Sequence, residues 1–190
     1  MILGVTGGTG GGKTTVLREA EKRGALVLDC DEIYHELLAT NPAMLAEIEH
    51  RFPGTAENGV LERKKLGKLV FADENALRDL NEITHRYVCA EVERRLECKP
   101  PFAVIDAIGL LESGLAALCT ATIAVTAPME ARIVRLMRRE GIDREYAISR
   151  IRAQKPDSYF TENCTYTLCN DYPTVAEFEA AVNEFLDSIL

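Results

Sequence analysis

Short apolar runs recur along the chain and alternate with longer segments in which apolar residues are spaced three or four positions apart. Short apolar runs of this kind are typical of buried strands in a parallel sheet. Strands that alternate with helices imply parallel crossover connections, and therefore a doubly wound α/β sheet. The predicted strands are Met1–Thr6, Leu26–Leu28, Phe102–Asp106, Thr122–Val125 and Tyr166–Cys169.

The longer segments predict helices. Thr14–Arg23 has helical spacing, and Gly24 is placed to end it. Asn41 followed by Pro42 is typical of an N-cap and a first helical position. The other predicted helices between strands are Glu32–Ala39, Met129–Arg139, Arg144–Gln154 and Val175–Ile189, whereas Pro53–Gly59 and Lys155–Cys164 are predicted as connections.

The middle of the chain, Leu61–Leu96, is helical with Asp73 as an internal N-cap, and it contains no strand candidate longer than three residues. This stretch is therefore predicted to be an insert into the sheet. Because no linker rich in Pro, Gly or Ser divides the chain, we expect one domain over residues 1–190. Its core is predicted at 1–60 and 100–190, with a helical insert at about 61–97 and a helical lid at about 138–155.

Composition narrows the class of protein. The 190 residues are 47% hydrophobic and 27% charged, which is ordinary for a soluble globular protein. The net charge of −8 argues against broad binding to nucleic acid or to anionic membranes. There is no apolar run of the roughly 18 residues that a membrane span needs, no basic segment typical of a signal peptide, and no Cys-x-x-Cys pair. We expect a cytoplasmic protein with reduced thiols.

The strongest motif is the glycine-rich segment of residues 7–14, which fits G-x-x-x-x-G-K-[ST] between the first strand and the first helix. Glycines let backbone amides turn toward phosphate oxygens, and the helix dipole then faces the anion. Lys13 is expected to reach the β- and γ-phosphates and the Thr14 hydroxyl to ligate Mg²⁺. The motif predicts a P-loop NTPase-type fold, a three-layer parallel sheet that binds ATP. The candidate ATP contacts are Gly8, Gly10, Gly11, Gly12, Lys13, Thr14 and Thr15.

Three aspartates lie at or just after the ends of predicted strands, where carboxylates face the ligand crevice of an open parallel sheet. Asp29 or Asp31 could orient or deprotonate an attacking hydroxyl or join the magnesium shell; alternatively, they cap a helix, with Asp31 ahead of Glu32. Asp106 has a Walker-B-like position, with a plain strand-end turn as the alternative.

Seven arginines lie between Arg132 and Arg152 on an otherwise acidic protein. Arg132, Arg135 and Arg139 share one helical face, and Gly141 is placed as the hinge of a closing lid. Mobile arginines stabilise the charge that develops during phosphoryl transfer. The alternative, expected for most of the seven, is a solvated face paired with Glu140 and Glu145.

Several segments together resemble the dephospho-CoA kinase family. They are the phosphate loop, Asp29-Cys-Asp-Glu-Ile, Leu69-Val-Phe-Ala-Asp, Ile83-Thr-His, Glu112-Ser-Gly-Leu, and Arg150-Ile-x-x-Gln ahead of Asn170. The resemblance implies transfer of the ATP γ-phosphate to the ribose 3′-hydroxyl of dephospho-CoA. It assigns activation of that hydroxyl to Asp31, lid contacts to Arg139 and Arg150, and a place near the adenine to Asn170. The helical insert would receive the acceptor. The candidate acceptor contacts are Thr6, Asp31, His35, His85 and Asp106.

The sequence departs from the commonest family pattern at His35, Arg86, Ile108-Gly109 and Tyr172, none of which removes a group with a named chemical role. The implied partners are the small molecules ATP, with Mg²⁺, and dephospho-CoA. We expect no nucleic acid or membrane partner and a monomeric protein. The competing readings are a kinase for another nucleotide or small molecule, and a nucleotide-binding switch. The guanine-reading Asn-Lys-x-Asp motif of a common GTPase switch is absent from the sequence.

Overall fold

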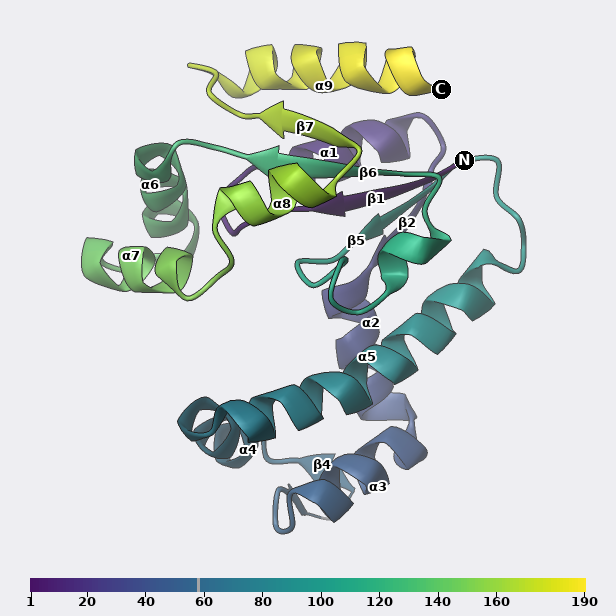
Figure 1. Ribbon diagram of the computed structural model, residues 1–190, viewed down its shortest axis with the longest axis vertical. Coiled ribbons are helices and arrows are strands. Elements are labelled where there is room, and N and C mark those ends of the chain that lie inside the picture. The colour runs from purple at the N-terminus through teal and green to yellow at the C-terminus, as the bar shows by residue number, and fades with distance from the viewer. Residues whose placement is uncertain (58) are drawn as a thin grey trace. The chain divides into compact units, whose positions relative to one another are not determined.

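A computed structural model describes residues 1–57 and 59–190. Within them, a five-stranded sheet has the strand order β2-β5-β1-β6-β7, with β1 between β5 and β6 (Figure 1). The pairs β1–β5, β1–β6 and β6–β7 are parallel. The strands are β1 (Ile2–Thr6), β2 (Leu26–Asp29), β5 (Ala103–Asp106), β6 (Ala121–Thr126) and β7 (Tyr166–Cys169). The predicted parallel α/β sheet is confirmed.

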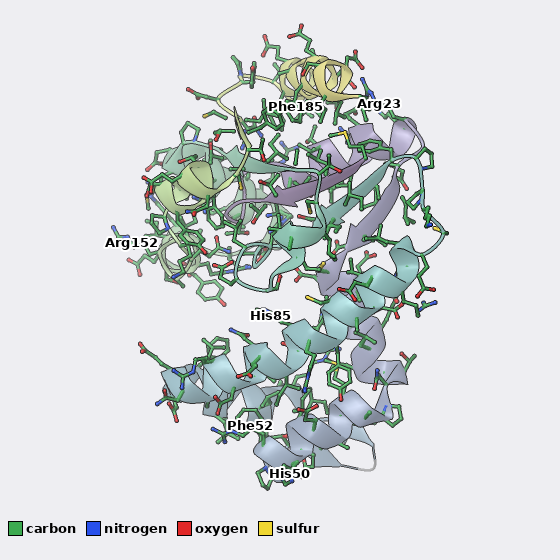
Figure 2. The ribbon with its side chains drawn as sticks, turned by 45° about the vertical axis from the view of Figure 1, so that its right-hand side comes forward. Arg23, His50, Phe52, His85, Arg152 and Phe185 are labelled. Carbon is green, nitrogen blue, oxygen red and sulfur yellow. The ribbon has the colours of Figure 1, made fainter. Side chains whose placement is uncertain are left out.

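One face of this sheet packs against α1 (Lys13–Lys22) and α9 (Val175–Ile189). Leu3 and Val5 of β1 alternate toward this face, and both are fully buried. Arg23, directly after α1, forms an ion pair with Asp187 of α9 at 2.7 Å, and the Phe185 ring of α9 lies edge-on to a ring of β7 (Figure 2). The apolar alternation of a central strand thus fixes which face the two helices cover.

At Gly4 of β1, the opposite face of the sheet is covered by residues that follow β5. A Cβ atom on Gly4 of β1 would lie 2.7 Å from the Leu110 side chain and 2.8 Å from Cys119 Sγ, so this strand position admits only glycine without displacement. Near these residues lies the 3₁₀ helix η1 (Leu115–Leu118), and α8 (Asp157–Asn163) contributes the buried Phe160. The prediction of a plain connection over Lys155–Cys164 was wrong, because a single buried aromatic residue anchors a short polar helix there.

Two helices rich in arginine follow β6. They are α6 (Met129–Glu140) and α7 (Arg144–Arg152), which share a small apolar cluster around Ile133 and Leu136. Gly141 ends α6 with φ of 66°, a left-handed conformation that favours glycine. The Asp143 side chain then accepts a hydrogen bond from the Tyr146 amide at 2.7 Å and caps α7.

The chain forms two compact units, the first comprising Met1–Leu28 and Lys99–Leu190 and the second Asp29–Cys98. The second unit contains α2 (Cys30–Thr40), α3 (Pro42–Arg51), α4 (Arg63–Ala72), α5 (Glu74–Leu96) and a hairpin of β3 (Ala56–Glu57) with β4 (Val60–Leu61). It begins at Asp29, ahead of the helical stretch predicted from residue 61.

Two predicted N-caps in the second unit are confirmed. The Asn41 side chain accepts from the Met44 amide at 3.0 Å, and Asp73 accepts from the Asn75 amide at 2.8 Å. The prediction of a loop over Pro53–Gly59 was wrong in part, since β3 lies inside it; residue 58 is outside the described residues. In the part of the chain that the structure describes, no helix combines the length and apolarity that crossing a membrane requires.

Candidate phosphate-transfer site

The glycine-rich segment connects β1 to α1 as a tight loop against the end of β6. Gly7 has φ of 129°, and a Cβ atom there would lie 2.2 Å from the Val125 carbonyl oxygen. Gly12, the N-cap of α1, has φ of 117°. A Cβ atom on Gly12 would lie 2.4 Å from the side-chain nitrogen of Asn170. Both positions therefore require glycine for conformation and for space.

The carbonyl groups of the loop are held by side chains from elsewhere in the first unit. The Asn170 amide donates to the Gly11 carbonyl at 3.0 Å, and Arg135 donates to the carbonyls of Gly10 at 3.1 Å and Gly11 at 3.3 Å. Arg135 also donates to the Asn170 carbonyl at 3.3 Å, and burial lowers the pKa of its guanidinium. Asn170, expected near the adenine, here supports the loop.

A loop whose carbonyls are tied on one side presents its amides on the other side, which is the arrangement of an anion-binding nest. Within residues 1–57 and 59–190, the amide nitrogens of Gly10, Gly12 and Thr14 have no protein acceptor. The dipole of α1 adds positive potential at the same place. The loop can therefore bind a phosphate group.

Lys13 and Thr14 lie in the first turn of α1. The Lys13 ammonium donates to the Gly7 carbonyl at 2.9 Å, which folds the side chain back over the loop. Thr14 is exposed, and Thr15 donates its amide to the Gly12 carbonyl at 3.0 Å. The Lys13 ammonium, which is expected to contact phosphate, therefore lies at the loop. The Thr14 hydroxyl is accessible to a ligand.

Asp106 ends β5 and pairs in register with Val5 of β1, two residues before the phosphate loop begins at Gly7. Its side chain is half-buried. The Thr6 hydroxyl donates to the Ile108 carbonyl at 3.0 Å and so holds the turn that follows Asp106. The structure places Thr6 and Asp106 at the carboxyl ends of neighbouring parallel strands, where ligands bind in sheets of this kind.

The two aspartates at the start of α2 have different roles in the fold. Asp29 Oδ1 accepts from the amides of Asp31 at 2.9 Å and Glu32 at 3.1 Å, so Asp29 is the N-cap. The alternative in which Asp31 caps the helix was wrong, because α2 begins at Cys30 and includes Asp31 in its first turn. The Asp31 carboxylate is exposed, and His35 is exposed one turn later on the same helix.

His85 lies in the second unit, half-buried on α5 (Figure 2). Its neighbour Arg86 forms an ion pair with Glu47 of α3, and this hydrogen bond is the main cause that lowers the pKa of Glu47. Arg86 therefore contributes to the packing of the second unit.

Arg139 and Arg150, expected to contact ATP, share one carboxylate in this structure. Arg139 donates to Glu140 at 2.5 Å, and Arg150 donates to the other oxygen of the same side chain. The hydrogen bond from Arg139 is the main cause that lowers the pKa of Glu140. The pairing with Glu140 that was considered as an alternative is present for these two arginines.

Three residues around the loop were not singled out as site residues from the sequence. Arg132, Gln154 and Asp157 form a connected group at the tip of the phosphate loop. The sequence signal that could have identified Gln154 is its position as the last residue of the Arg-Ile-x-x-Gln segment. The burial of Arg132 could not be predicted, because its spacing with Arg135 and Arg139 is also that of a solvated helix face.

A parallel sheet with a glycine-rich loop and lysine after its central strand defines a P-loop nucleotide-binding protein. The family model of dephospho-CoA kinase matches residues 1–175, and the chain belongs to this family of kinases. A dephospho-CoA kinase of Lactobacillus johnsonii is 31% identical over 195 residues, which cover 99% of this chain and 98% of the relative.

Solved structures support the fold. The crystal structure of TT1252 from Thermus thermophilus has a TM-score of 0.83 at 30% identity, covering 100% of this chain and 98% of that one. Dephospho-CoA kinase from Campylobacter jejuni has a TM-score of 0.70 at 23% identity, covering 99% and 96% of the two chains, and supports the fold.

Proposed function

We propose that this protein transfers the γ-phosphate of ATP to the 3′-hydroxyl of the ribose in dephospho-CoA, giving coenzyme A and ADP, the last step of coenzyme A biosynthesis. The observation that carries the proposal is the phosphate loop, with Lys13 folded over it, in a chain whose family match runs over residues 1–175.

Lys13 and the loop amides are proposed to hold the phosphates of ATP. The loop is fixed through its carbonyls before ATP arrives, so little reorganisation is needed when charge develops on the transferred group. The Thr14 hydroxyl, exposed at the start of α1, is an oxygen ligand of the kind that Mg²⁺ accepts. When bound, Mg²⁺ neutralises charge on the β- and γ-phosphates. Gly8, Gly10, Gly11, Gly12 and Thr15 complete the proposed ATP contacts.

Asp31 is proposed to activate the ribose hydroxyl. Its carboxylate is exposed and is not the cap of α2, because Asp29 has that role. A free carboxylate can accept a hydroxyl proton, or orient the hydroxyl for in-line attack. Thr6, His35, His85 and Asp106 are proposed as further acceptor contacts, with residues of about 61–97 receiving the acceptor.

The end of α6 and the whole of α7, about residues 138–155, are proposed to act as a lid hinged at Gly141. In a closed lid, Arg139 and Arg150 would leave the Glu140 carboxylate and donate to phosphate oxygens instead. Both guanidinium groups would then lie at the transferred group, where arginine stabilises developing charge. Asn170 would lie near the adenine while it continues to support Gly11.

We further propose that the protein works as a cytoplasmic monomer on small molecules alone. The net charge of −8 supports the exclusion of nucleic acid, since phosphate backbones attract basic surfaces.

A coupled assay of ADP release tests this function. Dephospho-CoA, adenosine, AMP and shikimate are offered separately with Mg²⁺ and ATP, and the product is located by phosphorus NMR. We expect rapid release with dephospho-CoA and phosphate on the 3′-oxygen. Faster turnover with another acceptor would favour a different small-molecule kinase, and acceptor-independent slow release would favour a nucleotide switch.

A further inference from the structure

Thr9, at the tip of the phosphate loop, has both of its backbone polar groups held by side chains. Its amide donates to Gln154 Oε1 at 2.8 Å, and its carbonyl accepts from Arg132 Nε at 2.8 Å. The amide and the carbonyl belong to successive peptide units, so two side chains fix two adjoining planes of the backbone. Arg132 lies on α6, and Gln154 lies just after α7.

The Arg132 guanidinium is itself held in place. The residue is only 5% exposed, and it donates to Asp157 Oδ1 at 2.9 Å and to Gln154 Oε1 at 3.4 Å. A buried charge is tolerated when it is paired and hydrogen-bonded, and Asp157 in the first turn of α8 meets this need. We call Arg132, Gln154 and Asp157 the Thr9 clamp.

The Thr9 clamp also fills the space beside the preceding loop residue. A Cβ atom on Gly8 would lie 2.2 Å from an Arg132 guanidinium nitrogen and 2.8 Å from the guanidinium carbon. The backbone of Gly8 is outside the left-handed region, so its conformation does not require glycine. The guanidinium, rather than the backbone, therefore excludes a side chain at this position.

We propose that Arg132 and Gln154 are positioning residues for ATP, with Asp157 holding Arg132 in register. They fix the Thr9 backbone, and through it the neighbouring loop amides that face the phosphates. This deepens the proposed function and rests on it, because the loop must be the ATP phosphate site. Positioning matters in phosphoryl transfer, where a shift of about 1 Å can cost about 10²-fold in rate.

The test measures ATP binding by calorimetry in the absence of acceptor, and then the KM of each substrate. Gln154→Met keeps the length of the side chain and removes the acceptor atom. We expect the Kd and KM for ATP to rise about tenfold, as loss of one hydrogen bond to a positioned group predicts, with the KM for dephospho-CoA unchanged. Arg132→Lys, whose single ammonium cannot serve both Thr9 and Asp157, is expected to show a similar rise.

A double variant checks that the two residues act on one element. Because both hold the same backbone segment, Arg132→Lys combined with Gln154→Met is expected to weaken ATP binding no more than about twofold beyond the worse single variant. Fully multiplicative effects would mean two independent contacts and would contradict a clamp.

The matched control is Arg18→Gln. Arg18 also joins two helices, α1 and α9, through an ion pair with Glu179, and it is exposed. Its loss should leave ATP binding within about twofold. Asp157→Asn, which keeps an acceptor for Arg132 but removes the paired charge, should weaken ATP binding less than Asp157→Ala does.

The proposal fails if folded Gln154→Met binds ATP within twofold of the wild type, or if its melting temperature falls with no change in ATP affinity. If Gln154→Met does not fold, Gln154→Asn is tested by the same criteria. This variant keeps the amide group but shortens the side chain by one methylene, so the amide no longer reaches Thr9. Since ATP binding is measured without acceptor, a wild-type protein that is inactive toward dephospho-CoA would overturn the proposed function alone.

Discussion

Lys13 is the residue on which we expect phosphate transfer to depend most directly. Its ammonium lies 2.9 Å from the Gly7 carbonyl, over the loop that the proposal assigns to ATP. We expect Lys13→Ala to lower kcat by about 10²–10³-fold or more, as loss of a preorganised electrostatic contact commonly does. Lys13→Arg should fail too, because a broad guanidinium does not replace a point charge. Steady-state kinetics measure both.

The control for this prediction is Lys22→Ala, on the same helix. Lys22 pairs with Glu19 at 2.7 Å and is the last residue of α1, at the opposite end of the helix from the loop, so its loss should affect stability rather than turnover. If Lys13→Ala kept more than a tenth of wild-type activity, the loop would not be the catalytic phosphate site.

Asp31 and Asp29 can be separated because only Asp29 caps α2. We expect Asp31→Asn to lower kcat by at least about 100-fold, with ATP binding and melting temperature unchanged, because the amide cannot accept a proton. Asp29→Asn should be milder, since asparagine caps a helix about as well as aspartate. The measurement is steady-state kinetics at saturating dephospho-CoA. Near-normal turnover of folded Asp31→Asn would show that Asp31 does not activate the hydroxyl.

At the scale of single residues, the sequence identified the loop because glycine spacing has a direct chemical meaning. It could not say which of Asp29 and Asp31 caps the helix, since either spacing fits and the choice depends on where α2 begins. Nor could it place Arg132, whose burial depends on Thr9 and Asp157, respectively 123 and 25 positions away along the chain.

Within elements, the long helix α5 carries an ionic cluster with a measurable pH dependence. Glu91 accepts hydrogen bonds from Arg94 and Arg95 at 2.7–2.8 Å, and these lower its pKa from 4.5 to about 2. A carboxyl group with a lowered pKa in the folded state stabilises the fold above its unfolded pKa. That stability is lost as the pH falls from about 4.5 toward 2.

We therefore expect Glu91→Gln to reduce the free energy of unfolding by about 1 kcal/mol at pH 7, the upper range for a partly exposed pair. The difference from the wild type should shrink as the pH falls below about 4.5. Urea unfolding at several pH values measures it, with Glu93→Gln on the same helix as a control. A difference that stays constant down to pH 3 would mean that the ion pairs do not contribute.

Elements with a strong apolar period were predicted well, and those without one were not. Val175–Ile189 has the predicted bounds because its buried residues recur at helical spacing, and Tyr166–Cys169 has the predicted bounds although none of its four residues is buried. By contrast, α8 is polar except for Phe160 at its centre, and β3 has only two residues. Such elements form because tertiary packing supports them, and local sequence does not signal them.

For the molecule as a whole, we expect activity to require Mg²⁺ or Mn²⁺ although folding does not. Across residues 1–57 and 59–190, no group of three or more His, Cys, Asp or Glu side chains is placed to hold a metal ion. EDTA should thus abolish turnover and leave the melting temperature unchanged, and excess Mg²⁺ should restore activity. Stoichiometric zinc in active protein, detected by elemental analysis, would contradict this prediction.

The contact between Gly8 and Arg132 has a consequence for how this chain can change over evolutionary time. An alanine at position 8 would displace the guanidinium before it disturbed the backbone, so the substitution is harmful while Arg132 is present. Once a shorter residue replaces Arg132, the guanidinium that excludes a Cβ atom at position 8 is gone. Substitutions at these two sites are therefore expected in a fixed order, with Arg132 replaced before Gly8. A side chain at position 8 would then make a later return to arginine at position 132 harder.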